Sequence, residues 1–207
     1  MPTADQTRSL TFDVLQDDFG PALDEVARLR LELFREFPYL YEGTAESEAE
    51  YLRTYALAPG ALLVLARDGE RVVGACTAVP LEHEVEELQA PFRAAGLDPA
   101  QVLYIGEALL ETEYQSRGLG GELLDRAEAQ AAALNLPLIA AAMVQRPADH
   151  PLMPAGWRSP RKFVDRRGYV MRPDLDTTLT WQEVGEAQPS PKPMRFWVLE
   201  RGSGSAV

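Results

Sequence analysis

Two glycines in one short segment stand where a phosphate group could be bound. The segment joins an apolar stretch to a strongly amphipathic one, and it consists of Gln115, Ser116, Arg117, Gly118, Leu119, Gly120 and Gly121. Because Gly118 and Gly120 have no Cβ, the backbone N–H groups beside them can approach an anion closely. A helix that begins here leaves its first N–H groups unpaired and adds partial positive charge. We therefore predict a phosphate-binding loop that works through its main chain.

The spacing of these glycines excludes two common kinds of phosphate-binding loop. A Walker A loop needs Lys and then Ser or Thr after its last glycine, whereas Gly121 is followed by Glu122 and Leu123. The dinucleotide fingerprint needs a small residue three positions after its second glycine, and Leu123 occupies that position. A nucleotide-hydrolysing enzyme and a dinucleotide-dependent enzyme are both disfavoured.

Hydrophobic periodicity predicts the elements that position this loop. Apolar residues indicate a buried strand over Val102–Leu110, a loop over Glu111–Gly118, an amphipathic helix over Leu119–Asn135 and a second strand over Pro137–Val144. A strand, a helix and a strand of these lengths form a right-handed crossover between parallel neighbours.

The remaining elements complete the expected fold. We predict strands over Leu10–Leu15, Ala61–Arg67, Arg71–Val79, Thr177–Val184 and Met194–Glu200, and helices from Pro21 to Phe37, from an N-cap at Ser47 to Leu57, over Val85–Ala95 and over Arg158–Arg167. This order predicts an α/β fold with a mixed, largely antiparallel central sheet, one parallel crossover and helices on both faces. We expect Met194–Glu200 to form an exposed sheet edge that could pair with a second copy in a homodimer.

The residues before the glycines extend the pattern. An apolar strand end, Ala108 to Leu110, is followed by an acidic turn, Glu111 to Glu113, then by Tyr114 and the Gln-x-x-Gly-x-Gly segment. In this order the chain resembles the GNAT superfamily of acetyl-CoA-dependent N-acetyltransferases. The resemblance covers about residues 10 to 200 as a pattern of elements, and it is specific in residue type over 108 to 121.

The resemblance implies how acetyl-CoA would be held. Backbone amides of Arg117 to Gly121 would bind the coenzyme A pyrophosphate, with Gln115 and Ser116 in the same cofactor-binding loop. Backbone groups of Ala108, Leu109 and Leu110 would bind the pantetheine arm and the thioester carbonyl. The two parallel strands are expected to splay apart there, which leaves backbone groups free to pair with the pantetheine amides.

Acetyl transfer also requires the acceptor to lose a proton. An alkyl amine has a pKa of about 10.4 and is mostly protonated at neutral pH, so a base is needed. Glu107 is the first candidate for a catalytic residue, because it interrupts an apolar strand just before the expected acetyl position. An ordinary ion-paired glutamate is the alternative.

The acid that would assist the departing thiolate is less clearly marked. Members of the family commonly place a tyrosine four residues before the Gly of a Gly-Phe or Gly-Tyr pair. Gly168 and Tyr169 form such a pair, but the position four residues earlier holds Val164. Either Tyr104 supplies a hydroxyl, or the thiolate leaves unassisted because its pKa is only about 8.5.

Several polar residues could border an acceptor pocket. His150 follows the strand expected beside the acetyl group and is a candidate substrate-binding residue. The carboxylates of Glu82, Glu84, Glu86 and Glu87 would attract a cationic amine if they bordered the pocket, although a solvated helix surface is the more ordinary explanation. Tyr39, Tyr41 and Tyr51 could form its rim or could simply pack in the core or in a lid. His83 and His150 lack a third ligand at a suitable spacing, so no metal site is predicted.

Composition limits the location and the partners. The 207 residues include one cysteine, Cys76, which cannot form an internal disulfide, and the first residues lack the pattern of a secretory signal. No apolar run approaches the roughly 20 residues that span a bilayer, so we expect a cytoplasmic protein. We predict one domain over 10–201, a polar leader over 1–9 and a flexible tail over 202–207.

The net charge of −12 disfavours nucleic acids and anionic membranes as partners. A basic cluster at Arg158, Arg161, Lys162, Arg166 and Arg167 is either a solvated helix face or lies near a small phosphorylated ligand. The sequence thus predicts an N-acetyltransferase that acts on a small-molecule or peptide amine. A non-catalytic acyl-CoA sensor is the alternative.

Overall fold

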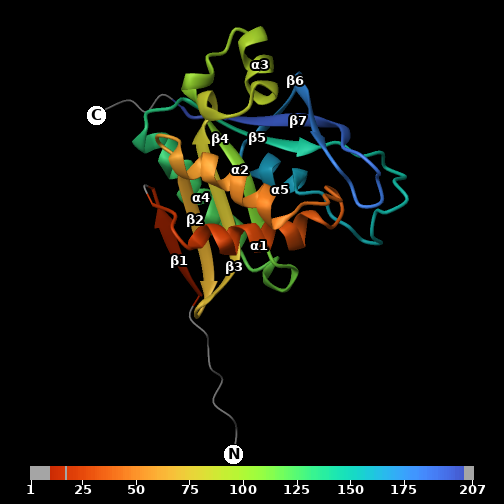
Figure 1. The fold of residues 1–207 in the computed structure, drawn as a ribbon. Helices are drawn as coiled ribbons and strands as arrows, with labels where there is room; N and C mark the ends of the chain where they lie inside the picture. Colours follow the sequence, from red (N-terminus) through yellow and green to blue (C-terminus); the bar gives the residue numbers. More distant parts are fainter. Residues whose placement is uncertain (1–9, 17, 203–207) are drawn as a thin grey trace, which may run out of the picture.

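A seven-stranded mixed sheet runs through the residues described by the computed structural model, which are 10–16 and 18–202 (Figure 1). Its strands are β1 (Leu10–Leu15), β2 (Leu62–Asp68), β3 (Arg71–Pro80), β4 (Val102–Leu110), β5 (Leu138–Val144), β6 (Val170–Trp181) and β7 (Ser190–Glu200). They lie side by side in the order β1-β2-β3-β4-β5-β7-β6. Only the β4–β5 pair is parallel among these strands, so the predicted mixed and largely antiparallel α/β fold is confirmed.

Helices cover both faces of this sheet (Figure 1). They are α1 (Ala22–Phe34), α2 (Ala45–Leu57), α3 (Glu86–Ala94), α4 (Leu119–Ala133) and α5 (Arg161–Arg166). One apolar core joins the sheet to α1, α2 and α3, and a second joins it to α4 and α5. Along β2, Leu63 and Leu65 belong to the first core and Leu62 and Val64 to the second, because successive side chains of a strand point to opposite faces.

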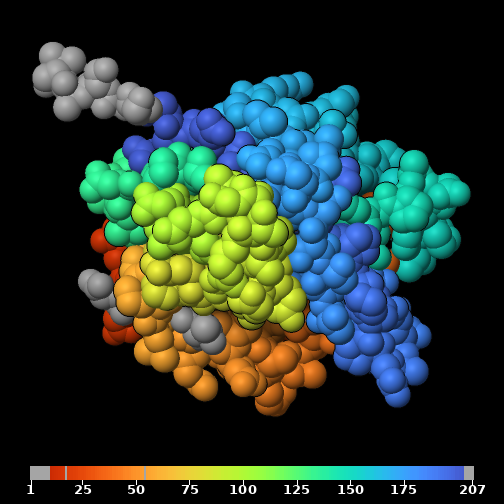
Figure 2. Space-filling view, turned by 90° about the horizontal axis from the view of Figure 1, so that it is seen from above, coloured from red at the N-terminus to blue at the C-terminus, as the bar shows by residue number. Residues whose placement is uncertain are grey.

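Helix α3 packs against the last part of the sheet, beside β6. Figure 2 shows its yellow-green segment against the blue segment that contains β6 and β7. The Thr177 hydroxyl of β6 donates a hydrogen bond to the Glu87 carbonyl of α3, with an oxygen–oxygen distance of 2.6 Å. Residues about ninety positions apart in the sequence are thereby fixed beside each other.

The predicted crossover is present, and its two parallel strands separate part-way along. Strands β4 and β5 pair from Val102 with Leu138 to Ile105 with Ala141, and beyond these residues they no longer pair. The register of β4 against β3 also shifts between Ile105 and Glu107, which leaves Gly106 as the extra residue of a bulge. The sheet therefore opens from Gly106 onward, as the resemblance implied.

The predicted starts of two helices were wrong, and α1 ends at Phe34 rather than at Phe37. The N-cap of α2 is Thr44, whose hydroxyl accepts from the Ser47 N–H, and Ser47 lies inside the helix as the other half of a capping box. Helix α5 begins at Arg161 after Pro160, so Arg158 lies in the preceding loop. In both cases a capping residue or a proline sets the start of the helix locally.

The expectation of an exposed edge at Met194–Glu200 was wrong as well. Strand β7 pairs with β5 on one side and with β6 on the other, so the outer strands of the sheet are β1 and β6. Phe196, Trp197 and Val198 are buried, which is typical of an interior strand covered on both faces. A homodimer stays a prediction, now without this edge as its basis.

The ends of the chain are only partly described. The predicted leader lies outside the described residues, and of the predicted tail only Gly202 falls within them. The assignment of 10–201 to one domain stays a prediction. In the part of the chain that the structure describes, no helix combines the length and the apolar character needed to cross a bilayer.

Candidate active site

The glycine loop ends at the start of α4 with unpaired backbone donors. Gly118 is the N-cap of the helix at φ 85°, a conformation that favours glycine, and no side chain caps the helix. The N–H groups of Gly121 and Glu122 donate to the Gly118 carbonyl at 2.9 and 3.3 Å. The N–H groups of residues 116–120 donate to no atom of the described residues. This is the donor set that an anion at a helix N-terminus requires.

Helix α5 lies directly beside this loop. A Cβ on Gly120 would lie 3.9 Å from Phe163 Cζ, and one on Gly121 would lie 3.8 Å from Arg167 Nη1. Arg167 is paired with Asp125 and Glu128 of α4. Within the described residues, the side chains of Arg158, Lys162 and Arg166 have no ion-pair partner and are exposed. Arg167 of the basic cluster therefore lies close to the loop. Both explanations of the cluster, a solvated helix face and a place near a phosphorylated ligand, stay predictions.

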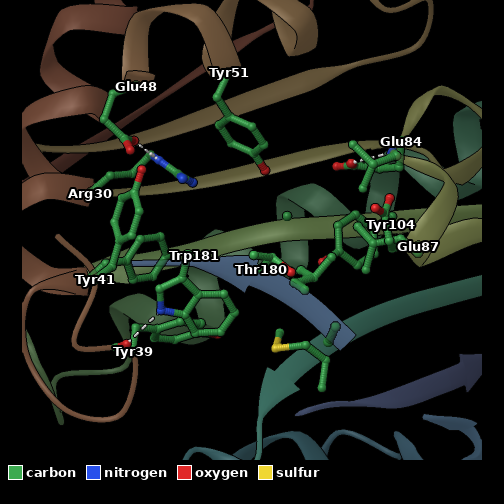
Figure 3. Close-up of a pocket in the computed structure, with 17 residues that line it drawn as sticks. Arg30, Tyr39, Tyr41, Glu48, Tyr51, Glu84, Glu87, Tyr104, Thr180 and Trp181 are labelled. Carbon is green, nitrogen blue, oxygen red and sulfur yellow. Dashed lines mark hydrogen bonds and ion pairs between the residues drawn. The ribbon is translucent and has the colours of Figure 1, made fainter. Parts of the chain in front are cut away.

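A cavity of about 370 Å³ opens where β4 and β5 separate (Figure 3). Its wall includes Gly106 and Ala142, the first residues after the last paired positions, Ile105 and Ala141. The other lining residues are Arg30, Phe34, Tyr39, Tyr41, Glu48, Tyr51, Glu84, Val85, Glu87, Leu88, Tyr104, Leu179, Thr180, Trp181 and Met194. The cavity is thus aromatic and acidic, and it lies at the gap in the sheet.

A buried charge network holds one side of this cavity. Arg30 of α1 donates hydrogen bonds to the carboxylates of Glu48 and Glu107. The second oxygen of Glu107 accepts from the Thr77 hydroxyl of β3, and the side chain of Glu107 is 1% exposed. Both carboxylate oxygens of Glu107 are thus engaged inside the protein, and Glu107 does not line the cavity.

A chain of hydroxyl groups leads to a second carboxylate. The Tyr51 hydroxyl donates to the Tyr55 hydroxyl at 3.1 Å, and the Tyr55 hydroxyl donates to Glu84. Burial raises the pKa of Tyr39 to about 12 and holds those of Tyr55 and Tyr104 well above their usual range. These hydroxyl groups therefore stay protonated near neutral pH and act as hydrogen-bond donors.

Comparison with known proteins identifies the family. The model of the acetyltransferase (GNAT) family matches residues 26–153, which is more than half of the chain. The chain belongs to this family. No curated protein matches it. The matched span contains the glycine loop, both strands that separate and most of the cavity wall, so the GNAT assignment and the local geometry agree.

Solved GNAT-like structures share the fold at low sequence identity. A protein from Acinetobacter baylyi classed as an acetyltransferase superposes with a TM-score of 0.63 at 11% identity, over 93% of each chain. A similarly classed protein from Salmonella typhimurium, solved with its cofactor acetyl-CoA, gives a TM-score of 0.57 at 12% identity over 94% of this chain and 96% of that one. A polyamine N-acetyltransferase from Drosophila melanogaster gives 0.57 at 17% identity over 92% and 100%.

Two residues discussed in the sequence analysis, His150 and Val164, do not line the cavity. His150 does not line it, and its ring lies 5.3 Å from that of Phe37 while its Nδ1 accepts from the Leu152 N–H at 3.2 Å. Val164 of α5 is buried in the core between this helix and the sheet. The substrate-binding role of His150 stays a prediction, as does the identity of the acid. No group of three His, Cys, Asp or Glu side chains among the described residues is arranged to hold a metal ion.

Other cavity residues were not anticipated from the sequence. Arg30 is a charged residue that follows Val26 by four positions and so falls on the apolar face of α1, where it is 9% exposed. Of the four neighbouring carboxylates, Glu84 and Glu87 line the cavity whereas Glu82 and Glu86 do not. No pattern in the sequence pointed to Trp181, because only the topology of the sheet brings this residue to the site.

Proposed function

We propose that this chain transfers the acetyl group of acetyl-CoA to a primary amine of a small molecule or peptide by direct attack. One observation carries the proposal. The acidic, aromatic cavity includes Gly106 and Ala142 at the point where the parallel strands part, so an acceptor in the cavity would meet a thioester lying in the gap.

The residues of the gap and loop fit the co-substrate. From Gly106 on, one side of β4 has no strand partner among the described residues, so backbone groups of Ala108, Leu109 and Leu110 are available to the amides of a pantetheine arm. The unpaired N–H groups within Gln115–Gly121 suit a pyrophosphate. The exposed basic side chains near α5 suit a further phosphate in a chain of net charge −12.

The charge of the cavity favours a cationic acceptor. Arg30 is neutralised by Glu48 and Glu107, which leaves Glu84 and Glu87 to set the sign of the site. Aromatic rings around an acidic cavity stabilise an ammonium group and an apolar chain together. The similar fold of the Drosophila polyamine N-acetyltransferase is consistent with an amine acceptor.

A covalent acetyl-enzyme is not part of the proposal. Cys76 is fully buried, and burial raises the pKa of its thiol to about 12, so it is neither ionised nor accessible. The amine nitrogen would attack the thioester directly, and the thiolate is a good enough leaving group to depart with or without help from Tyr104. A cytoplasmic location also stays a prediction.

Turnover on a panel of amines tests the proposal. Purified protein is incubated with acetyl-CoA and with putrescine, tyramine, lysine methyl ester or a short peptide with a free N-terminus, and thiol release is followed. We expect turnover on at least one cationic amine and saturable calorimetric binding of coenzyme A. Tight binding without turnover on any amine would favour the acyl-CoA sensor, and absence of binding would refute both functions.

A further inference from the structure

One half-buried carboxylate on the cavity wall is not engaged in an ion pair. Glu48 is paired with Arg30, and Glu87 is exposed at the start of α3. Glu84 is half-buried, and within the described residues it has no cationic partner at ion-pair distance. Its carboxylate accepts hydrogen bonds from the Tyr55 hydroxyl and, at 3.2 Å, from the Val85 N–H.

The carboxylate of Glu84 is also held in place and faces the cavity in which an acceptor amine would lie. It follows the short 3-10 helix Leu81–His83 at the end of β3, and its pair of hydrogen bonds fixes the carboxylate. Figure 3 shows the carboxylate directed into the cavity, across from Arg30 and Glu48. The titratable or charged groups that face it are Arg30 from α1, Tyr51 and Tyr55 from α2, Glu87 from α3, Tyr104 from β4 and Tyr39 from the segment after α1.

We infer that Glu84 accepts the proton of the acceptor ammonium in this enzyme, and that Glu107 is a positioning residue which holds Arg30. The inference rests on the proposed function. Glu84 takes one proton from the ammonium group, and the freed lone pair forms the carbon–nitrogen bond to the acetyl group. The carbon–sulfur bond breaks with its electron pair going to sulfur. The second nitrogen proton goes to the thiolate, and Glu84 releases its own proton to solvent.

The surroundings of Glu84 suit this role. Burial raises its pKa above the usual range, while the Tyr55 hydroxyl, the Val85 N–H and the charge of Arg30 act in the opposite direction. A carboxyl group whose pKa moves toward neutrality exchanges protons more effectively at the working pH. Glu107 is less suited to this role, because it is ion-paired with Arg30 and does not line the cavity.

Glu84→Gln tests the inference, with Glu82→Gln as the matched control. Glu82 is exposed two residues away and does not line the cavity. We expect Glu84→Gln to lower kcat/KM for the fastest amine of the panel by about 100-fold or more. The acidic limb that reports Glu84 should be replaced by a rate that keeps rising toward the pKa of the amine. Coenzyme A binding stays unchanged in both variants, and Glu82→Gln keeps the wild-type profile.

A weakly basic acceptor separates proton transfer from a merely structural effect. Ethylamine is a cation at neutral pH, whereas trifluoroethylamine is largely neutral there and has no proton that must be removed before attack. We expect Glu84→Gln to lose much more of its activity on ethylamine than on trifluoroethylamine. Equal losses on the two amines, or a wild-type rate and pH profile on ethylamine, would overturn the inference.

A second variant decides the matter if Glu84→Gln does not fold. Tyr55→Phe removes the hydroxyl that stabilises the ionised carboxylate of Glu84, so the acidic limb should move to higher pH. An unmoved limb would contradict the role of Glu84. The proposed function fails separately, if the wild-type protein acetylates no amine at all.

Discussion

The guanidinium of Arg30 on α1 donates a hydrogen bond to the buried carboxylate of Glu107 on β4, seventy-seven positions away in the chain. The same guanidinium is bound by Glu48 of α2 and lies 4.2 Å from the centre of the Tyr51 ring. Because Glu107 also accepts from Thr77 of β3, one cation connects two helices and two strands beside the cavity. The positive charge of Arg30 is balanced by buried carboxylates of the protein and is not available to bind a ligand.

Replacing Arg30 should destabilise the fold strongly. Arg30→Ala leaves Glu48 and Glu107 buried without a countercharge, and the expected loss in the free energy of unfolding is about 3–5 kcal/mol. Arg35→Ala is the control, because the Arg35–Glu42 pair is largely exposed and should contribute no more than about 1 kcal/mol. Urea unfolding of both variants measures the difference. A loss below about 1 kcal/mol for Arg30→Ala would show that the network does not hold these elements together.

Gly120→Glu should remove co-substrate binding without unfolding the protein. A Cβ at this position meets only Phe163 Cζ at 3.9 Å, so the fold can accept a side chain. A carboxylate beside the loop N–H groups would repel the pyrophosphate that they are expected to bind. Several charge-assisted hydrogen bonds of about 1.5–3 kcal/mol each are then lost. Calorimetry should report coenzyme A affinity lowered by more than about 100-fold.

The milder variant Gly120→Ala is the control for this loop. Its methyl group makes only an ordinary contact with Phe163, so it should retain most of the affinity. A Gly120→Glu protein that keeps its melting temperature and its affinity for coenzyme A would place the pyrophosphate elsewhere.

The turn between β6 and β7 should contribute a pH-dependent part of the stability. Glu186 there accepts hydrogen bonds from Lys192 at 2.8 and 2.9 Å and from the Ser190 hydroxyl and the Glu183 N–H, and chiefly Lys192 lowers its pKa from 4.5 to about 2. A pKa that is lower in the folded chain stabilises the fold above the unfolded value of 4.5. This stabilisation disappears as the pH falls toward about 2.

Glu186→Gln isolates that contribution. The variant should be less stable than the wild type at about pH 6, and the gap should narrow steadily as the pH is lowered to about 3. Glu36→Gln, which removes the same charge at an exposed position, should show no such trend. A gap that is constant with pH would mean that Glu186 acts through something other than its charge. Denaturant unfolding at each pH gives the comparison.

Much of the fold could be predicted from the sequence because its signals are local. The strand Val102–Leu110 has both of its predicted ends, and the following helix starts at Leu119 as predicted. The signals that set these positions, apolar periodicity and the glycines of the loop, extend over only a few residues of sequence. The parallel pair and the glycine loop followed from the lengths and order of these elements. The misplaced start of α2 at Ser47 shows the limit of such signals, because both Thr44 and Ser47 can cap a helix.

The candidate site depended on contacts that no local pattern encodes. A carboxylate in a run of four looks the same at Glu84 as at Glu82. Only tertiary contacts, among them the hydrogen bond from Tyr55 of α2, partly bury Glu84 in the cavity wall and leave Glu82 in water.

The sequence alone thus determined the loop, the crossover and the family resemblance, because each depends on neighbours along the chain. The tertiary structure alone decided the lining of the cavity, the pairing of Arg30 with Glu107 and the interior place of β7. Burial and charge pairing are set by side chains that meet only after the sheet has formed.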